Sequence, residues 1–311
     1  MGSEMCIRDR DTGMKILNFG SLNIDHVYKV PHFVKKGETL SSEDLKQYPG
    51  GKGLNQSIAL AKAGMSVWHA GVIGADGQFL SDILTAAGVH TELLHTDTKT
   101  PTGHAIIQND VQGDNCILLY GGTNQQITTI YADEVLSHFG SGDYLVLQNE
   151  INQLSYIIIN AKARGMKIIL NPSPMDAKIF ELPLHLIDLF FVNEIEAAGL
   201  IKSKLSDADI SDNEELASRL QELFPENDFV LTLGEEGSMY LSSDTQIYQP
   251  AFKIKAVDTT AAGDTFTGFF LSGLLHGKNI PASLELASKA SAITCSRAGA
   301  AVSIPTMEEV K

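Results

Sequence analysis

Short apolar runs recur along the chain and alternate with stretches that have the pattern of helices. The runs predict strands buried on both faces, at residues 15–20, 67–73, 144–147, 167–170, 189–192 and 229–233. Helices are predicted at residues 53–63, 78–87, 154–164, 213–223 and 265–275. This alternation predicts an α/β fold with a mostly parallel central sheet flanked by helices.

Two regions, at about residues 24–48 and 102–120, alternate polar and apolar residues instead. They predict antiparallel strands that form a small accessory β-sheet, a lid over the main body. No internal repeat or linker divides the rest, so residues 14–311 are expected to form one domain. Residues 1–13 are polar and lack an apolar segment, so we expect a non-native or disordered leader there.

Composition limits the classes of function. Hydrophobic residues make up 43% of the 311 residues and charged residues 20%, as in an ordinary globular protein. The formal net charge of −15 excludes broad attraction to nucleic acid or to an anionic membrane. No apolar run approaches the ~20 residues that span a bilayer. Cys6, Cys116 and Cys295 lie far apart without metal-ligand spacing, which favours the reducing cytoplasm.

The strongest chemical signal lies in residues 258–268, Asp-Thr-Thr-Ala-Ala-Gly-Asp-Thr-Phe-Thr-Gly. The small residues Ala261, Ala262 and Gly263 allow a tight turn, and an apolar helix is predicted to follow. The amides at a helix N-terminus favour an anion, so a phosphoryl group could bind there while Asp264 accepts a hydroxyl proton. The alternative is that Asp264 only caps the helix.

A second glycine-rich segment, Gly50-Gly51-Lys52-Gly53-Leu54-Asn55, precedes a predicted helix. It is not a P-loop, and Gln56 stands where a dinucleotide fingerprint needs its third glycine. Close backbone approach to a ligand and an ordinary strand–helix turn both explain it.

Polar residues also follow several predicted strands: Asn23 and Asp25, Glu150, residues 193–196 and residues 232–237. Because ligands gather beyond the carboxyl ends of parallel strands, these residues are expected to outline one cleft.

Four of these segments, in order, carry a family resemblance: residues 20–26, 51–55, 193–196 and 258–268. From residue 14 to the end, the chain resembles the ribokinase-like carbohydrate kinase family. Many members have glycine at the position of Ala261. The resemblance implies a three-layer fold with a β-sheet lid and transfer of the γ-phosphoryl group of ATP to a small sugar. The favoured acceptor is the 5-hydroxyl of D-ribose. Deoxyribose, fructose or adenosine as acceptor, and a non-catalytic sugar or nucleotide sensor, are the alternatives.

The resemblance also implies roles for single residues. Asp264 is the base, and the amides of Ala261, Ala262 and Gly263 hold the phosphoryl group. The implied sugar contacts are Asn23, Asp25, Gly51, Lys52, Gly53, Asn55, Glu150 and Asp264, and His104 and Ile106 of the lid are expected to face the sugar. The implied nucleotide contacts are Asn193, Thr232, Leu233, Gly234, Glu235, Glu236, Gly237, Gly263, Asp264 and Ser288.

Two metal ions and a partner are implied as well. Glu196 would organise Mg²⁺ through water. A K⁺ ion would lie beside the anion-binding turn, at Asp258, Thr260, Thr294, Arg297, Gly299 and Ser303. Paired lids would join two copies of the chain into a homodimer.

Overall fold

The computed structural model describes residues 13–205 and 212–311, so the leader expected at residues 1–13 lies, apart from Gly13, outside the described residues. The strands are β1 Ile16–Phe19, β2 Asn23–Lys29, β3 Asp44–Gly50, β4 Val67–Gly74, β5 Leu94–Asp97, β6 Gly103–Asn109, β7 Asn115–Tyr120, β8 Tyr144–Gln148, β9 Lys167–Asn171, β10 Leu189–Asn193, β11 Asp228–Thr232, β12 Gly237–Leu241 and β13 Gln246–Pro250. The helices are α1 Lys52–Lys62, α2 Gln78–Ala86, α3 Thr129–Leu136, α4 Leu154–Ala163, α5 Glu194–Lys204, α6 Asn213–Leu223, α7 Ala262–Leu275, α8 Ile280–Cys295 and α9 Met307–Val310.

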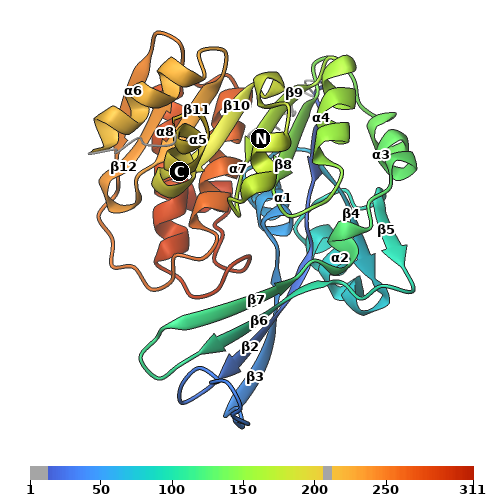
Figure 1. The fold of residues 1–311 in the computed structure, drawn as a ribbon. Coiled ribbons are helices and arrows are strands. Elements are labelled where there is room, and N and C mark those ends of the chain that lie inside the picture. The colour runs from blue at the N-terminus through green and yellow to red at the C-terminus, as the bar shows by residue number, and fades with distance from the viewer. Residues whose placement is uncertain (1–12, 206–211) are drawn as a thin grey trace, which may run out of the picture.

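Nine strands form the central sheet in the order β13-β12-β11-β10-β9-β8-β1-β4-β5 (Figure 1). All neighbouring pairs are parallel except those of β12, which is antiparallel to both β11 and β13. The α/β class with a mostly parallel sheet between helices is therefore confirmed. The predicted strands and helices are all present, within a few residues of their expected ends.

Alternating residues of the strands pack against opposite helix layers. In β10, Phe190 and Val192 pack into a core with residues of α3, α4, α5 and α6. Their neighbours Leu189 and Phe191 belong to a second core with residues of α1, α2, α7 and α8. Because both faces are buried, these strands consist of continuous apolar runs, which is why the sequence predicted them.

The lid is a separate four-stranded sheet, β3-β2-β6-β7, that projects from one edge of the body (Figure 1). The predicted antiparallel pairing is present within each region, in β2–β3 and β6–β7, but the central pair β2–β6 that joins the two regions is parallel. The lid therefore consists of two antiparallel pairs. These pairs are joined by the parallel strands β2 and β6, in which Asn23 aligns with Gly103. The outer strand β7 is exposed along its whole length.

Helix α7 begins at Ala262, three residues before the predicted start. Its N-cap residue, Ala261, has a φ of 62°, in the left-handed region that L-residues rarely adopt. This backbone conformation turns the chain into the helix early. Asp264 consequently lies in the first helical turn rather than in the loop ahead of it.

Candidate active site

A cavity of about 190 Å³ lies where the ends of β9, β10 and β11 meet the N-termini of α1 and α7. Its lining residues are Lys52, Asn171, Ser173, Phe191, Val192, Asn193, Glu196, Thr232, Ala261, Gly263 and Asp264. Seven of these were predicted from the sequence. The cleft expected at the carboxyl ends of the strands is therefore present.

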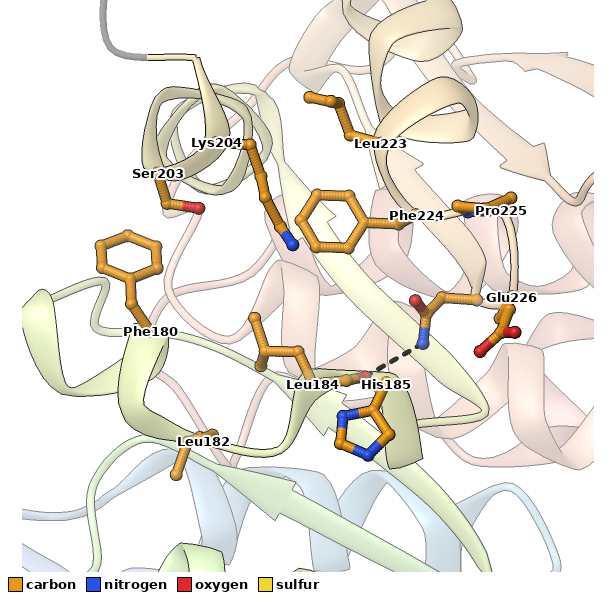
Figure 2. A pocket seen from close by; sticks show the side chains of 11 residues that line it. Phe180, Leu182, Leu184, His185, Ser203, Lys204, Leu223, Phe224, Pro225 and Glu226 are labelled. Carbon is orange, nitrogen blue, oxygen red and sulfur yellow. Dashed lines mark hydrogen bonds between the residues drawn. The ribbon is translucent and has the colours of Figure 1, made fainter.

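A larger hollow of about 450 Å³ lies elsewhere, between the segment 180–185 and the ends of α5 and α6 (Figure 2). Its walls combine apolar side chains such as Phe180 and Phe224 with polar ones such as Lys204 and Glu226. The amide of Asn227 donates to the carbonyl oxygen of Leu184 in its wall. It contains none of the residues predicted to carry chemistry, so size alone does not identify the functional site.

Asp264 is held by two side-chain amides of helix α1. Its Oδ2 accepts from Asn55 Nδ2 at 3.1 Å and its Oδ1 from Gln56 Nε2 at 2.9 Å. The side chain makes no cap, because the N-cap position belongs to Ala261 and has no side-chain hydrogen bond. The alternative that Asp264 merely caps the helix is therefore wrong. Asp264 is only 8% exposed and borders the cavity.

The anion-binding turn uses one of its own amides internally. The N–H of Ala262 donates to the carbonyl oxygen of Thr259 at 3.2 Å, and Ala262 does not line the cavity. In this structure the Ala262 amide therefore closes the turn, and its role in holding a phosphoryl group stays a prediction. Within the described residues no hydrogen-bond partner is found for the N–H of Gly263, and Gly263 borders the cavity. The free amides lie at a helix N-terminus, where they favour an anion.

A second group of polar residues lies on the lid side of Lys52. Oε2 of Glu150 accepts from Ser21 Oγ and from the backbone N–H of Lys52, the latter at 2.8 Å. Asn23 is buried, and its Oδ1 accepts from Asn124 Nδ2 at 2.7 Å. The Oδ1 atom of Asn55 is buried without a hydrogen-bond partner in the described structure. Such an unpaired acceptor is costly unless a ligand donates to it.

The carboxylates of this group perturb one another. Burial and the nearby charge of Glu150 raise the pKa of Asp25 to about 6. Burial also raises the pKa of Glu150, and hydrogen bonds from Ser21 and Lys52 offset this only in part. Burial by itself lowers the pKa of Lys52, but attraction by Asp264, Glu150 and Glu196 outweighs it, so the pKa of Lys52 ends above its ordinary value. Lys52 is therefore protonated and is attracted by three carboxylates.

The glycines of the second motif are required by close approach. A Cβ atom at Gly53 would lie 2.4 Å from the backbone nitrogen of Ser21, and one at Gly50 would lie 2.2 Å from Oδ2 of Asp25. Gly51 has a φ of 95°, which strongly favours glycine. The segment therefore brings α1 directly against the chain after β1, and it is more than an ordinary turn.

The register of the lid bears on the residues expected to face the sugar. Asp25 aligns with Ala105 of β6, so Ala105 and Ile107 share its face. His104 and Ile106 align with Ile24 and His26 on the opposite face. If Asp25 contacts the sugar as predicted, His104 and Ile106 do not face it, because an offset of one residue exchanges the faces of a strand.

Some of the residues predicted to bind nucleotide line the cavity, and others lie outside it. Asn193 and Thr232 line the cavity, and the side chain of Asn193 caps α5 in a capping box with Glu196. Gly234, Glu235 and Glu236 form a short 3₁₀ helix that follows β11, and β12 begins at Gly237. The side chain of Leu233 packs into the core instead, because it is apolar and follows a buried strand. Ser288 is buried on α8 and does not line the cavity.

The residues predicted to bind metal ions fall into two places. Glu196 lines the cavity together with Asp264. No cluster of three or more His, Cys, Asp or Glu residues able to hold a metal ion occurs in residues 13–205 and 212–311. The six residues of the expected K⁺ site lie around the end of α8, the loop after it and the segment before α7: Asp258, Thr260, Thr294, Arg297, Gly299 and Ser303.

Asp258 connects two of these segments. Its Oδ1 accepts from the N–H and hydroxyl of Thr260, at 2.9 and 2.6 Å, and its Oδ2 accepts from the N–H of Gly299 at 3.0 Å. Arg297 points to a different partner, since its guanidinium forms an ion pair with Glu309 at 2.7 Å. A guanidinium has no acceptor atom for a cation, so the backbone carbonyl is the one group of Arg297 that suits K⁺.

The predicted list missed Gln56, which donates to Asp264, and Gln148 and Asn18, which are linked to Gln56 by hydrogen bonds. It also missed Asn171 and Ser173, which line the cavity. Asn18 and Gln148 are fully buried polar residues in central strands. A polar residue in a run that otherwise predicts a buried strand was the available signal, because such groups need hydrogen-bond partners.

No helix in the described part of the chain combines the length and apolar character needed to cross a membrane.

Comparison with known proteins agrees with this geometry. The model of the pfkB family carbohydrate kinases matches residues 14–307. The ribokinase of Haemophilus influenzae is 33% identical over 297 residues, covering 93% of this chain and 95% of that protein. The crystal structure of Cryptococcus neoformans ribokinase in complex with ADP superposes with a TM-score of 0.85 at 32% identity, covering 96% of this chain and 98% of that one.

A further solved structure, Arabidopsis thaliana ribokinase complexed with ribose and ATP, superposes with a TM-score of 0.84 at 27% identity and covers 96% of this chain and 97% of that one. The match of the family model to nearly the whole chain, together with relatives above 30% identity, shows that this protein belongs to the pfkB family of carbohydrate kinases.

Proposed function

We propose that this protein is a cytoplasmic ribokinase, which transfers the γ-phosphoryl group of ATP to the 5-hydroxyl of D-ribose. The observation that carries the proposal is the placement of Asp264 between the free amides of the anion-binding turn and the polar group around Asn55, Asp25 and Glu150. A hydroxyl bound by that group would lie beside the base. Relatives that are ribokinases at 33% identity over nearly the whole chain support ribose as the acceptor.

The chemistry of the polar group suits an unphosphorylated sugar. Asp25 and Glu150 offer carboxylate oxygens, and Asn55 offers its unpaired Oδ1, all of which accept hydrogen bonds from hydroxyls. Lys52 is the one cation in this described group, and three carboxylates already attract it. A phosphorylated acceptor would need a further Arg or Lys.

In the proposed reaction the carboxylate of Asp264 takes the proton of the 5-hydroxyl. The oxygen of that hydroxyl attacks the γ-phosphorus in line. The bond from that phosphorus to the bridging oxygen breaks, and ADP leaves. Lys52 and the amide of Gly263 stabilise charge on the phosphoryl oxygens, and the lid excludes water from the site. Positioning and electrostatics thus supply most of the catalysis.

Deoxyribose is the second candidate acceptor, because the deoxyribokinase of Salmonella typhi is 28% identical over 95% of this chain. The test is release of ADP from Mg-ATP and K⁺ with ribose, deoxyribose, fructose, adenosine and fructose phosphate. Preference for ribose with product phosphorylated at the 5-hydroxyl supports the proposal. Preference for another acceptor would indicate that the lid residues Ala105 and Ile107 determine which sugar is accepted. No turnover of any acceptor favours a non-catalytic sensor.

The residues present fit Mg²⁺ and K⁺. Mg²⁺ usually keeps several waters and is bound by one or two carboxylates plus substrate phosphates, which matches a cavity holding Glu196 but no dedicated cluster of acids. Bound there, Mg²⁺ would neutralise charge on the phosphates. For K⁺, burial raises the pKa of Asp258, but hydrogen bonds from Thr260 and Gly299 outweigh burial and the pKa is lowered, so the loop carries a carboxylate.

Exchange of K⁺ for tetramethylammonium at constant ionic strength is expected to lower kcat by about tenfold, because the turn that holds Gly263 would lose its support. The measurement is the steady-state rate at saturating ribose and Mg-ATP. A matched exchange of chloride for acetate, with K⁺ kept, should leave the rate unchanged. An unaltered kcat without K⁺ would remove the cation from the proposal.

The KM for ribose is expected to rise about tenfold between pH 7.5 and pH 5, because Asp25 has a pKa of about 6 and binds hydroxyls as a carboxylate. The sign follows from the raised pKa: protonation begins just below neutral pH and removes the acceptor. Asp25→Asn is the control, with a higher KM at pH 7.5 that stays flat down to pH 5. A wild-type KM without pH dependence would show that Asp25 does not bind the sugar.

The proposal extends to a homodimer formed through the lids. The outer strand β7 exposes Ile117, Leu118, Leu119 and Tyr120, each by about half or more of its surface. An edge strand offers unpaired backbone groups to another chain, and a contiguous exposed apolar patch marks a protein–protein interface. A second lid would cover them and enclose the sugar more fully.

A further inference from the structure

A continuous network of buried polar side chains leads from Asp264 into the centre of the molecule. Gln56, Gln148 and Asn18 are each at most 1% exposed, and they lie on α1, β8 and β1. Gln56 Nε2 donates to Oδ1 of Asp264 at 2.9 Å. Gln148 Nε2 donates to Oε1 of Gln56 at 2.7 Å and to Oδ1 of Asn18 at 3.0 Å. Hence three side chains from separate elements are fixed relative to the carboxylate.

The direction of each hydrogen bond follows from the charge on Asp264. A carboxylate only accepts, so Gln56 must present its amide nitrogen to Asp264 and its oxygen to Gln148. Gln148 must then present its nitrogen to Gln56, and Asn18 must receive the second hydrogen of that nitrogen with its oxygen. Reversing any side-chain amide in this network would place two donors or two acceptors in contact. One orientation of the network is therefore enforced.

The network ends at a neutral histidine. Asn18 Nδ2 donates to Ser57 Oγ at 2.8 Å, and this hydroxyl lies 2.7 Å from Nδ1 of His69. Burial lowers the pKa of His69 to about 4, so the ring is neutral at physiological pH. Ser57 then donates to Nδ1. The far end of the network is therefore uncharged.

We propose that Gln56 is a positioning residue for the base: it holds Oδ1 of Asp264 so that Oδ2 stays directed at the accepting hydroxyl, and Gln148 and Asn18 hold Gln56. This inference rests on the proposed phosphoryl transfer, because it needs Asp264 to act as the base. Asn55 alone cannot fix the carboxylate, since a single hydrogen bond leaves rotation about it free. Two donors on successive residues of α1 define the plane of the carboxylate.

The test is a double-mutant cycle between Gln56→Met and Asp264→Asn, read as kcat and KM of the folded enzyme. Methionine keeps the length of the side chain but cannot donate. Gln56→Met is expected to lower kcat by about 10- to 100-fold with both KM values within about threefold, as misplacement of a base does. In the Asp264→Asn background the same substitution is expected to change the residual kcat by less than about threefold.

Ser57→Ala is the matched control, because it disrupts the far end of the network but leaves the hydrogen bond from Gln56 to Asp264. It is expected to lower the melting temperature and to keep kcat. Equal losses of kcat from Gln56→Met in both backgrounds, or full activity in Gln56→Met, would overturn the inference. If Gln56→Met does not fold, Gln148→Met takes its place in the cycle with the same criterion. An inactive wild-type enzyme would instead contradict the proposed function.

Discussion

Asp264→Asn is expected to lower kcat by about 10² to 10⁴, the range supplied by a general base, while the protein stays folded. Asparagine has the same shape and keeps an oxygen that can accept from Asn55 or Gln56, but it cannot take the proton of the 5-hydroxyl. The loss should fall on kcat, because the hydroxyl is still bound by the residues around Glu150. The measurements are kcat, both KM values and the circular dichroism melting curve.

The control for this substitution is Asp143→Asn. Asp143 lies just before β8, at the opposite end of the strand from the site, and accepts from the backbone N–H groups of Lys15 and Gly140. The same change there should lower stability by about 1 kcal/mol and leave kcat intact. A value of kcat for Asp264→Asn within about threefold of the wild type would contradict the assignment of the base. Loss of activity with loss of folding would assign Asp264 a structural role.

The central sheet could be predicted because its strands are buried on both faces. Runs such as residues 189–192 and 229–231 have no polar interruption, which is typical of a strand covered on both faces. Strands at the margin were not predicted. Strand β13 has alternating exposed and half-buried residues, and β5 spans only Leu94–Asp97. Their pairing depends on neighbours distant in sequence, which a local pattern does not contain.

The motifs located the site, but its geometry depends on long-range contacts. Asp25 and Glu150 are separated by 125 residues in sequence, yet their charges interact and raise the pKa of Asp25. The parallel pairing of β2 with β6 had no local signal either, and it decides which lid residues face the sugar. Likewise, the use of the Ala262 amide inside the turn follows from the left-handed conformation of Ala261. The sequence thus allowed the types of residue in the site to be predicted, but not the direction in which their side chains and backbone amides point.

Lys52→Met is expected to lower kcat by about 10² to 10³, the usual cost of losing one electrostatic contact to the transition state. Lys52 starts α1, lines the cavity with Asp264 and Gly263, and is attracted by three carboxylates. Without this cation the entering phosphates would meet the carboxylates of Asp264 and Glu196 with no positive side chain among the described lining residues to offset them. The KM for ATP should therefore rise as well. Steady-state kinetics in both substrates separate the two effects.

Two further variants sharpen this prediction. Lys52→Arg keeps the charge and should recover part of kcat, although the guanidinium is larger than the ammonium group and fits the cavity less well. Lys62→Met is the matched control: Lys62 ends the same helix, and its Nζ donates to the carbonyl oxygen of Ile304, far from the cavity. It should keep kcat. If Lys52→Met kept kcat and raised only the KM for ribose, Lys52 would bind the sugar without stabilising the phosphoryl group, and the positive charge for transfer would have to come from Mg²⁺ and the amides of the turn.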